Sequence, residues 1–106
     1  MNPALTEARV RASVRLLSVA EGGRPGPIKG SYRPNHNFFG PDNRNMLVGL
    51  IELRDGEELQ PGESAVFEIE FLNWSALRPE LRPGTAWLIQ EGAQVVGVGT
   101  VLEILS

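Results

Sequence analysis

The sequence predicts an all-β protein, a sandwich or barrel of six strands in a single domain of 106 residues. Twelve glycines and eight prolines gather in clusters, and short apolar runs lie between these clusters. Several of the runs alternate apolar and polar residues, which is the period of a strand with one buried face. No segment shows the helical period over the length of a typical helix.

The first three predicted strands cover residues 10–18, 36–39 and 46–53. In the first strand, apolar residues alternate with arginines and a serine, so we expect one buried and one solvated face. The second strand is short and follows Pro34. The third is apolar on both faces, so it is either covered on both sides or exposed at a contact surface.

The last three predicted strands cover residues 64–72, 85–91 and 94–105. Gly92 separates the fifth strand from the sixth and indicates a tight hairpin. Pro61-Gly62 precedes the fourth strand, and Pro83-Gly84 precedes the fifth. In both pairs the proline presets φ and the glycine supplies the positive φ of a type II turn.

The composition excludes several classes of site. The chain has no cysteine and one histidine, His36, which excludes disulfides, thiolate zinc sites and sites built on two imidazoles. It also lacks the phosphate-binding loop of nucleoside triphosphatases and the serine elbow of hydrolases. We therefore predict no enzyme activity, no cofactor, no metal and no bound nucleotide.

The boundaries and the location follow from the same pattern. Residues 1–7 are expected to be a loose leader, and residues 8–106 the barrel domain. No apolar run is long enough to cross a membrane, and the N-terminus lacks the pattern of a signal peptide, which predicts a cytoplasmic protein without membrane contact. The net charge of -3 and the pI near 5.1 argue against a general attraction to nucleic acid.

The segment 22–34 is rich in glycine and proline, and we expect it to be a long loop without secondary structure. Such loops often carry function, and cations interleaved with aromatic rings suit phosphate contact and base stacking. The alternative is a loop that closes the barrel, with its aromatic ring packed inward and its cations solvated. The candidate binding residues here are Arg24, Lys29, Tyr32, Arg33 and, just beyond the loop, His36.

Two glycines in the last strand are further candidates for binding. Gly97 and Gly99 lie one pleat apart on the same face and leave a strip without side chains, which would let another backbone approach closely. The alternative is a strand that bends at a corner of the barrel. Trp74, between two strands, is either a contact anchor or a cap on the end of the barrel.

Five blocks of sequence occur in the order and spacing of a known family. They are LSVAEGGR at 17–24, KGSYRP at 29–34, GLIEL at 49–53, PGE at 61–63, and IQEG with VGVGTV at 89–92 and 96–101. With these blocks, nearly the whole chain resembles the third, C-terminal β-barrel domain of elongation factor Tu. The resemblance implies a single six-stranded antiparallel β-barrel.

The resemblance also implies a set of contacts. In the full factor this domain packs on the second barrel, touches the GTPase domain, grips the T-stem side of aminoacyl-tRNA and takes part in contacts with the exchange factor. This chain is the barrel alone, so the resemblance implies no binding of GTP. Five positions depart from the family pattern: Pro25 replaces a histidine, Gln90 and Gln94 replace arginines, Ala93 replaces a glycine, and Glu103 replaces a lysine. Lost cations would weaken a contact with RNA.

These observations predict a non-enzymatic binding module, similar to the C-terminal barrel of elongation factor Tu, that contacts a translation-related protein or RNA. The alternative is a protein-interaction or homo-oligomerisation element unrelated to translation. The apolar strand 46–53 and the apolar Leu88 fit such a docking face. We expect a protein partner or a second copy of the chain first, and a tRNA-like RNA second.

Overall fold

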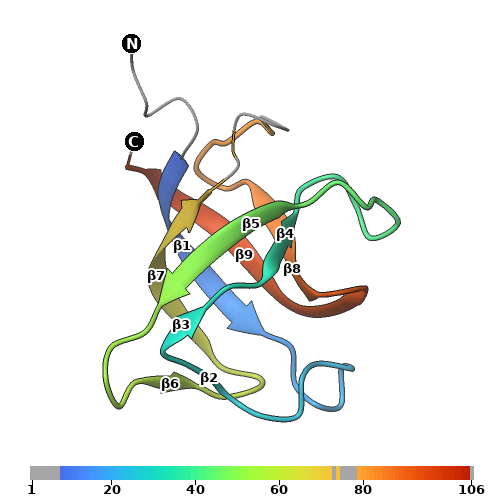
Figure 1. Cartoon of the computed structure of the whole chain (residues 1–106), viewed down its shortest axis with the longest axis vertical. Coiled ribbons are helices and arrows are strands. Elements are labelled where there is room, and N and C mark those ends of the chain that lie inside the picture. The colour runs from blue at the N-terminus through green and yellow to red at the C-terminus, as the bar shows by residue number, and fades with distance from the viewer. Residues whose placement is uncertain (1–7, 73, 75–78, 106) are drawn as a thin grey trace.

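The computed structural model describes residues 8–72, 74 and 79–105, so the predicted leader 1–7 lies outside the described residues. Within the described ranges the fold is all-β. Six antiparallel strands close a ring (Figure 1), which confirms the predicted barrel. In the order of the ring they are β1 (Ala8–Leu16), β7 (Ser64–Phe71), β5 (Leu47–Glu52), β4 (Asn35–Asn37), β8 (Ala86–Glu91) and β9 (Gln94–Ile104), which pairs with β1 again.

Three short strands lie outside this ring, and two of them correct the prediction for segment 22–34. They are β2 (Ile28–Lys29), β3 (Ser31–Tyr32) and β6 (Glu58–Leu59). β3 pairs with β5 beside β4, and β2 pairs with β6 as a separate ladder at the lower end of the molecule in Figure 1. Ile28 is buried in the core, so burial of its side chain holds this part of the segment against the barrel.

The core lies inside the ring, where the inward side chains of β1 show the predicted alternation. Val10, Ala12, Val14 and Leu16 are fully buried, while the arginines between them point outward. Each large apolar side chain buried in this way stabilises the fold by about 1.5–3 kcal/mol relative to an exposed one. The period-2 pattern therefore reports directly which face of β1 lines the barrel.

The two Pro-Gly turns and the glycine hairpin are confirmed. Gly62 and Gly84 have φ of 88° and 93°, the positive values that a type II turn requires at its third residue. In the first turn the Glu63 N–H donates to the Gln60 carbonyl at 3.0 Å. Glu91 pairs with Gln94 across a two-residue loop, and Gly92 there has a φ of 60°.

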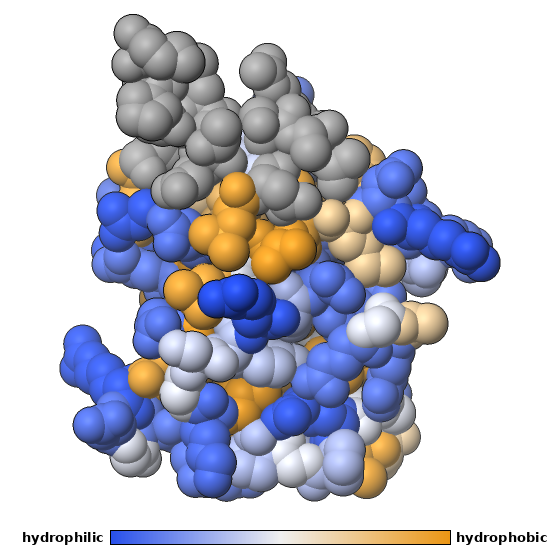
Figure 2. Space-filling model, in the orientation of Figure 1, coloured by the Kyte–Doolittle hydropathy of each residue, from blue (hydrophilic) through white to orange (hydrophobic). Residues whose placement is uncertain are grey.

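The strand that is apolar on both faces, β5, has one buried and one half-exposed side. Leu47 and Ile51 are fully buried, whereas Val48 and Leu50 face outward and are partly exposed. Hydrophobic surface gathers over this part of the barrel (Figure 2). Leu88 lies on β8, and β4 with its polar Asn35 separates it from Val48. The two apolar features predicted as one docking face are therefore separate.

Candidate functional site

The predicted cationic segment folds back on the β8–β9 hairpin. The Arg24 Nε–H donates to Glu91 Oε2 at 2.9 Å, and the Tyr32 hydroxyl donates to the same oxygen at 2.5 Å. The Arg24 guanidinium also lies 5.5 Å from the centre of the Tyr32 ring and donates to the Gly26 carbonyl at 3.0 Å. Arg24 and Tyr32 are thus brought together around an internal carboxylate.

Burial and the hydrogen bond to Glu91 raise the pKa of Tyr32 above its usual range. The side chains of Arg24 and Glu91 are only 24% and 34% exposed, so their charges largely cancel at this point of the surface. A phosphate that reached Arg24 would have to displace Glu91. The cluster therefore acts first as a tie between segment 22–34 and the barrel.

Lys29 and Arg33 are the remaining predicted cations of this segment. Both side chains are exposed, Lys29 on β2 and Arg33 between β3 and β4. Within the described residues neither one takes part in an ion pair. The segment therefore offers two free charges rather than the clustered three that the sequence suggested.

His36 lies in the core, which corrects the prediction that it contacts a phosphate or a carboxylate. Its side chain is fully buried, and its Nδ1 accepts a hydrogen bond of 2.9 Å from Trp87 Nε1. Burial lowers the pKa of His36 to about 4, and the Gly49 backbone only partly offsets this. Its Nε2 has no hydrogen-bond partner among the described residues. His36 is therefore a neutral packing residue at neutral pH.

Gly97 and Gly99 also face the interior, which corrects the prediction that a partner backbone approaches them. A Cβ on Gly99 would lie 2.3 Å from Cζ2 of Trp87, and a Cβ on Gly97 would lie 2.9 Å from the Arg15 carbonyl oxygen. The strip without side chains is filled by the chain itself. The two glycines make room for the Trp87 ring and for the neighbouring strand β1.

A shallow apolar groove lies between β8, β9 and the loop that joins β4 to β5. Its volume is about 300 Å³. Two of its walls are Phe38 and Trp87, whose rings stack 5.1 Å apart at 18°. Among the described residues none of its lining carries a charge: Asn37, Phe38, Gly40, Pro41, Ala86, Trp87, Leu88 and Val98. A surface of this kind suits an apolar side chain of a partner.

A polar network holds the wall of this groove in place. The buried Asn37 amide donates to Gln90 Oε1 at 2.7 Å and to the Gly40 carbonyl at 2.6 Å. Its own side-chain oxygen accepts from the Phe39 N–H at 3.0 Å and from the Asn43 amide at 3.4 Å. Buried amides that are satisfied in this way fix local geometry. The β4–β5 loop is thus tied to β4 and β8.

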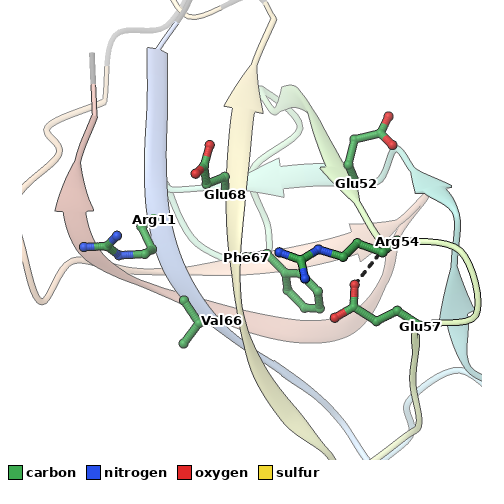
Figure 3. A pocket seen from close by; sticks show the side chains of 7 residues that line it. All are labelled: Arg11, Glu52, Arg54, Glu57, Val66, Phe67 and Glu68. Atoms are coloured by element: carbon green, nitrogen blue, oxygen red, sulfur yellow. Dashed lines mark hydrogen bonds between the residues drawn. The ribbon is translucent and has the colours of Figure 1, made fainter.

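A second hollow, of about 550 Å³, lies on the outside of β1, β5 and β7 (Figure 3). The side chain of Arg54 extends across it toward Phe67, and the Arg54 backbone N–H donates to Glu57 at 3.0 Å. Two arginines and three glutamates line the hollow, together with the half-exposed Val66. The opposite charges are mixed, so the hollow selects no ligand by net charge.

The groove was not predicted from the sequence, and Leu88 is its one lining residue that was predicted to lie on a docking face. The signal present in the sequence was Gln90, a polar residue at the end of the apolar run of β8, which marks the buried network. Trp74 packs against the core, with its ring 6.1 Å from that of Phe71, which is the role of a cap rather than a contact anchor.

In the described part of the chain no group of three metal-binding side chains comes together. Nor is any helix there long and apolar enough to cross a membrane. No known family model matches the sequence. The proposal of function therefore rests on the geometry of the barrel surface.

Proposed function

We propose that this chain is a non-enzymatic binding module whose ligand is a protein, docked at the apolar groove between β8 and the β4–β5 loop. One observation carries the proposal. The groove is a hollow of about 300 Å³ with no charged lining among the described residues, beside stacked Phe38 and Trp87 rings. Apolar burial at such a point is what drives protein association.

The distribution of charge favours a protein over RNA. Most arginines of the barrel surface already pair with a carboxylate, and the chain is acidic overall. The pairs are Arg9 with Glu68, Arg11 with Glu103, Arg15 with Glu21, Arg24 with Glu91, and Arg82 with Glu80. Duplex RNA is bound mainly through phosphate contacts, which need cations that are free.

The resemblance to the third barrel of elongation factor Tu suggests the kind of protein. In that factor the third barrel packs on the second barrel and touches the GTPase domain. A barrel of the same type is suited to the same surfaces, or to a partner that presents similar ones. We therefore place the partner among translation factors.

The test is calorimetric titration of the chain into elongation factor Tu truncated after its second domain. We expect saturable binding that changes little as salt rises. Ala86→Asp puts a charge at an exposed position of the groove and should weaken binding by about tenfold or more. Val66→Asp is the matched control, because Val66 is 54% exposed and lies on β7, away from the groove.

Two results would contradict the proposal. One is an absence of heat with the truncated factor at two temperatures, such as about 15 °C and about 35 °C, because apolar burial changes the heat capacity and must give heat at one of them. The other is binding of bulk tRNA that is lost steeply as salt rises and is insensitive to Ala86→Asp. The second result would move the function to an RNA contact through Lys29 and Arg33, since phosphate contacts give that dependence on salt.

A further inference from the structure

We propose that a second copy of this chain covers the groove, in a two-fold dimer in which Phe39 of each copy enters the groove of the other. The inference rests on the proposed function, because it uses the same groove. The inference adds that a second copy of the chain occupies the groove when no other partner is bound. A two-fold interface needs one surface patch that is complementary to itself.

The hollow half of that patch is the groove. It is open, apolar and large enough to hold an aromatic side chain within its volume of about 300 Å³. Trp87 is buried beneath the groove, and the partly buried Phe38 stacks on it and forms the aromatic part of the wall. Aromatic side chains pack favourably against one another in offset or edge-on geometry. An entering phenyl ring would therefore meet an aromatic partner.

The protruding half is Phe39. The residue is 49% exposed, so its ring is available to a partner. Its chain neighbours Phe38 and Gly40 both line the groove, so the protrusion and the hollow lie side by side. Phe39 belongs to the loop 38–46, which stands out from the barrel between β4 and β5 (Figure 1). One surface thus supplies both halves of a reciprocal contact.

The protrusion is held ready to dock. The Phe39 N–H donates to the Asn37 side-chain oxygen at 3.0 Å, and the Asn37 amide is itself bound to the Gly40 carbonyl and to Gln90. A backbone already fixed in this way loses little conformational freedom on association. The network described above therefore favours docking of the loop as a rigid unit.

The charges of the same loop are complementary across a two-fold axis. Asp42 and Arg44 are both exposed, two residues apart, and neither has an ion-pair partner in the described ranges. Gly40 and Pro41 of this loop line the groove that Phe39 of the other copy enters, so the two loops lie against each other across the axis. Asp42 of each copy then meets Arg44 of its partner, and two opposite-charge pairs form around the apolar contact.

The test is sedimentation velocity of the chain from about 1 µM to about 1 mM, a range that covers weak dimers. We expect a monomer–dimer equilibrium, and Phe39→Ser should raise the dissociation constant by about tenfold or more. Val66→Ser is the control, because it removes an equally exposed apolar side chain from β7. A chain that stays monomeric throughout, or a dimer that tolerates Phe39→Ser, would overturn the proposal.

A charge swap tests the geometry independently of folding. Asp42→Arg alone and Arg44→Asp alone should each weaken self-association by about tenfold, because like charges then meet across the axis. An equimolar mixture of the two variants should associate as tightly as the original chain, since both cross-axis pairs are again opposite. A mixture no tighter than either variant alone would show that the loops do not face each other.

The same variants separate this inference from the proposed function. Phe39→Ser should weaken the dimer by about tenfold or more and leave binding of the truncated elongation factor at least as tight, because the hollow remains and the competing copy is weakened. Ala86→Asp should weaken both, since Ala86 lines the hollow. A chain that stays monomeric at every concentration and binds the truncated factor would refute the dimer alone. An original chain that dimerises, together with a Phe39→Ser variant that never binds the truncated factor, would refute the proposed function alone.

Discussion

The buried His36 makes the free energy of unfolding of the barrel depend on pH between about 4 and 6.5. It is the one histidine of the chain, and its pKa is about 4 in the fold against 6.5 when exposed. Above pH 6.5 the imidazole is neutral in both states, and its contribution to stability is fully present. Below pH 6.5 the unfolded chain binds a proton that the folded chain does not, so stability falls until the pH reaches about 4.

The size of the effect follows from the two pKa values. One pKa unit is worth about 1.4 kcal/mol, so the total loss is about 3 kcal/mol, and the part between pH 7 and pH 5 is about 2 kcal/mol. The contribution of Glu21 falls in a lower window, because the ion pair with Arg15 lowers the pKa of that carboxyl to about 2. Urea denaturation at pH 7, 6 and 5, followed by tryptophan fluorescence, measures the loss attributed to His36.

A variant that keeps the hydrogen bond but does not titrate is the control. His36→Asn offers a carbonyl oxygen to Trp87 Nε1 in place of Nδ1, so its unfolding free energy should be nearly level between pH 7 and pH 5. An original chain whose unfolding free energy changes by less than about 0.5 kcal/mol over this range would refute the reasoning. An NMR titration that placed the folded His36 pKa near 6.5 would refute it as well.

Two further perturbations test the interior and the loop tie. Gly99→Ala should destabilise the fold by about 1–3 kcal/mol in urea denaturation, because its Cβ would lie 2.3 Å from the Trp87 ring. Gly26→Ala, with nothing within 4 Å and no positive φ, should stay within about 0.5 kcal/mol of the original chain. Glu91→Gln should lower the pKa of Tyr32, the one tyrosine, toward its usual value, as measured by absorbance at 295 nm. An unchanged tyrosine titration would mean that the carboxylate does not hold the hydroxyl.

The barrel strands were predictable because the sequence patterns that specify them lie within short segments of the chain. All six ring strands overlap the predicted ranges, since alternation in β1 and β7 and the glycine turns are visible within a few residues. The short strands β2, β3 and β6 were missed because two residues carry no period. β2 and β6 form where Ile28 and Leu59 are buried, and β3 forms where it pairs with β5, so all three depend on distant parts of the chain.

The site was less predictable because it depends on which face and which partner each residue meets. Arg24 was predicted to be a free cation, but it pairs with the carboxylate of Glu91, which is distant in the sequence. His36 and Gly99 were predicted to lie on the surface, but both face the interior and lie against the Trp87 side chain. Pairing of β4 and β9 with β8 sets these contacts, and register between distant strands leaves no local mark in the sequence.

The most direct test of the central claim is to locate the binding surface by NMR. Amide spectra of the labelled chain are recorded at a concentration below the dissociation constant of the dimer. Increasing amounts of elongation factor Tu truncated after its second domain are then added. We predict the largest changes at Phe38, Ala86 and Val98, the residues of the groove. Changes confined to Lys29 and Arg33, or none at saturating fragment, would contradict the claim that the groove is the docking site.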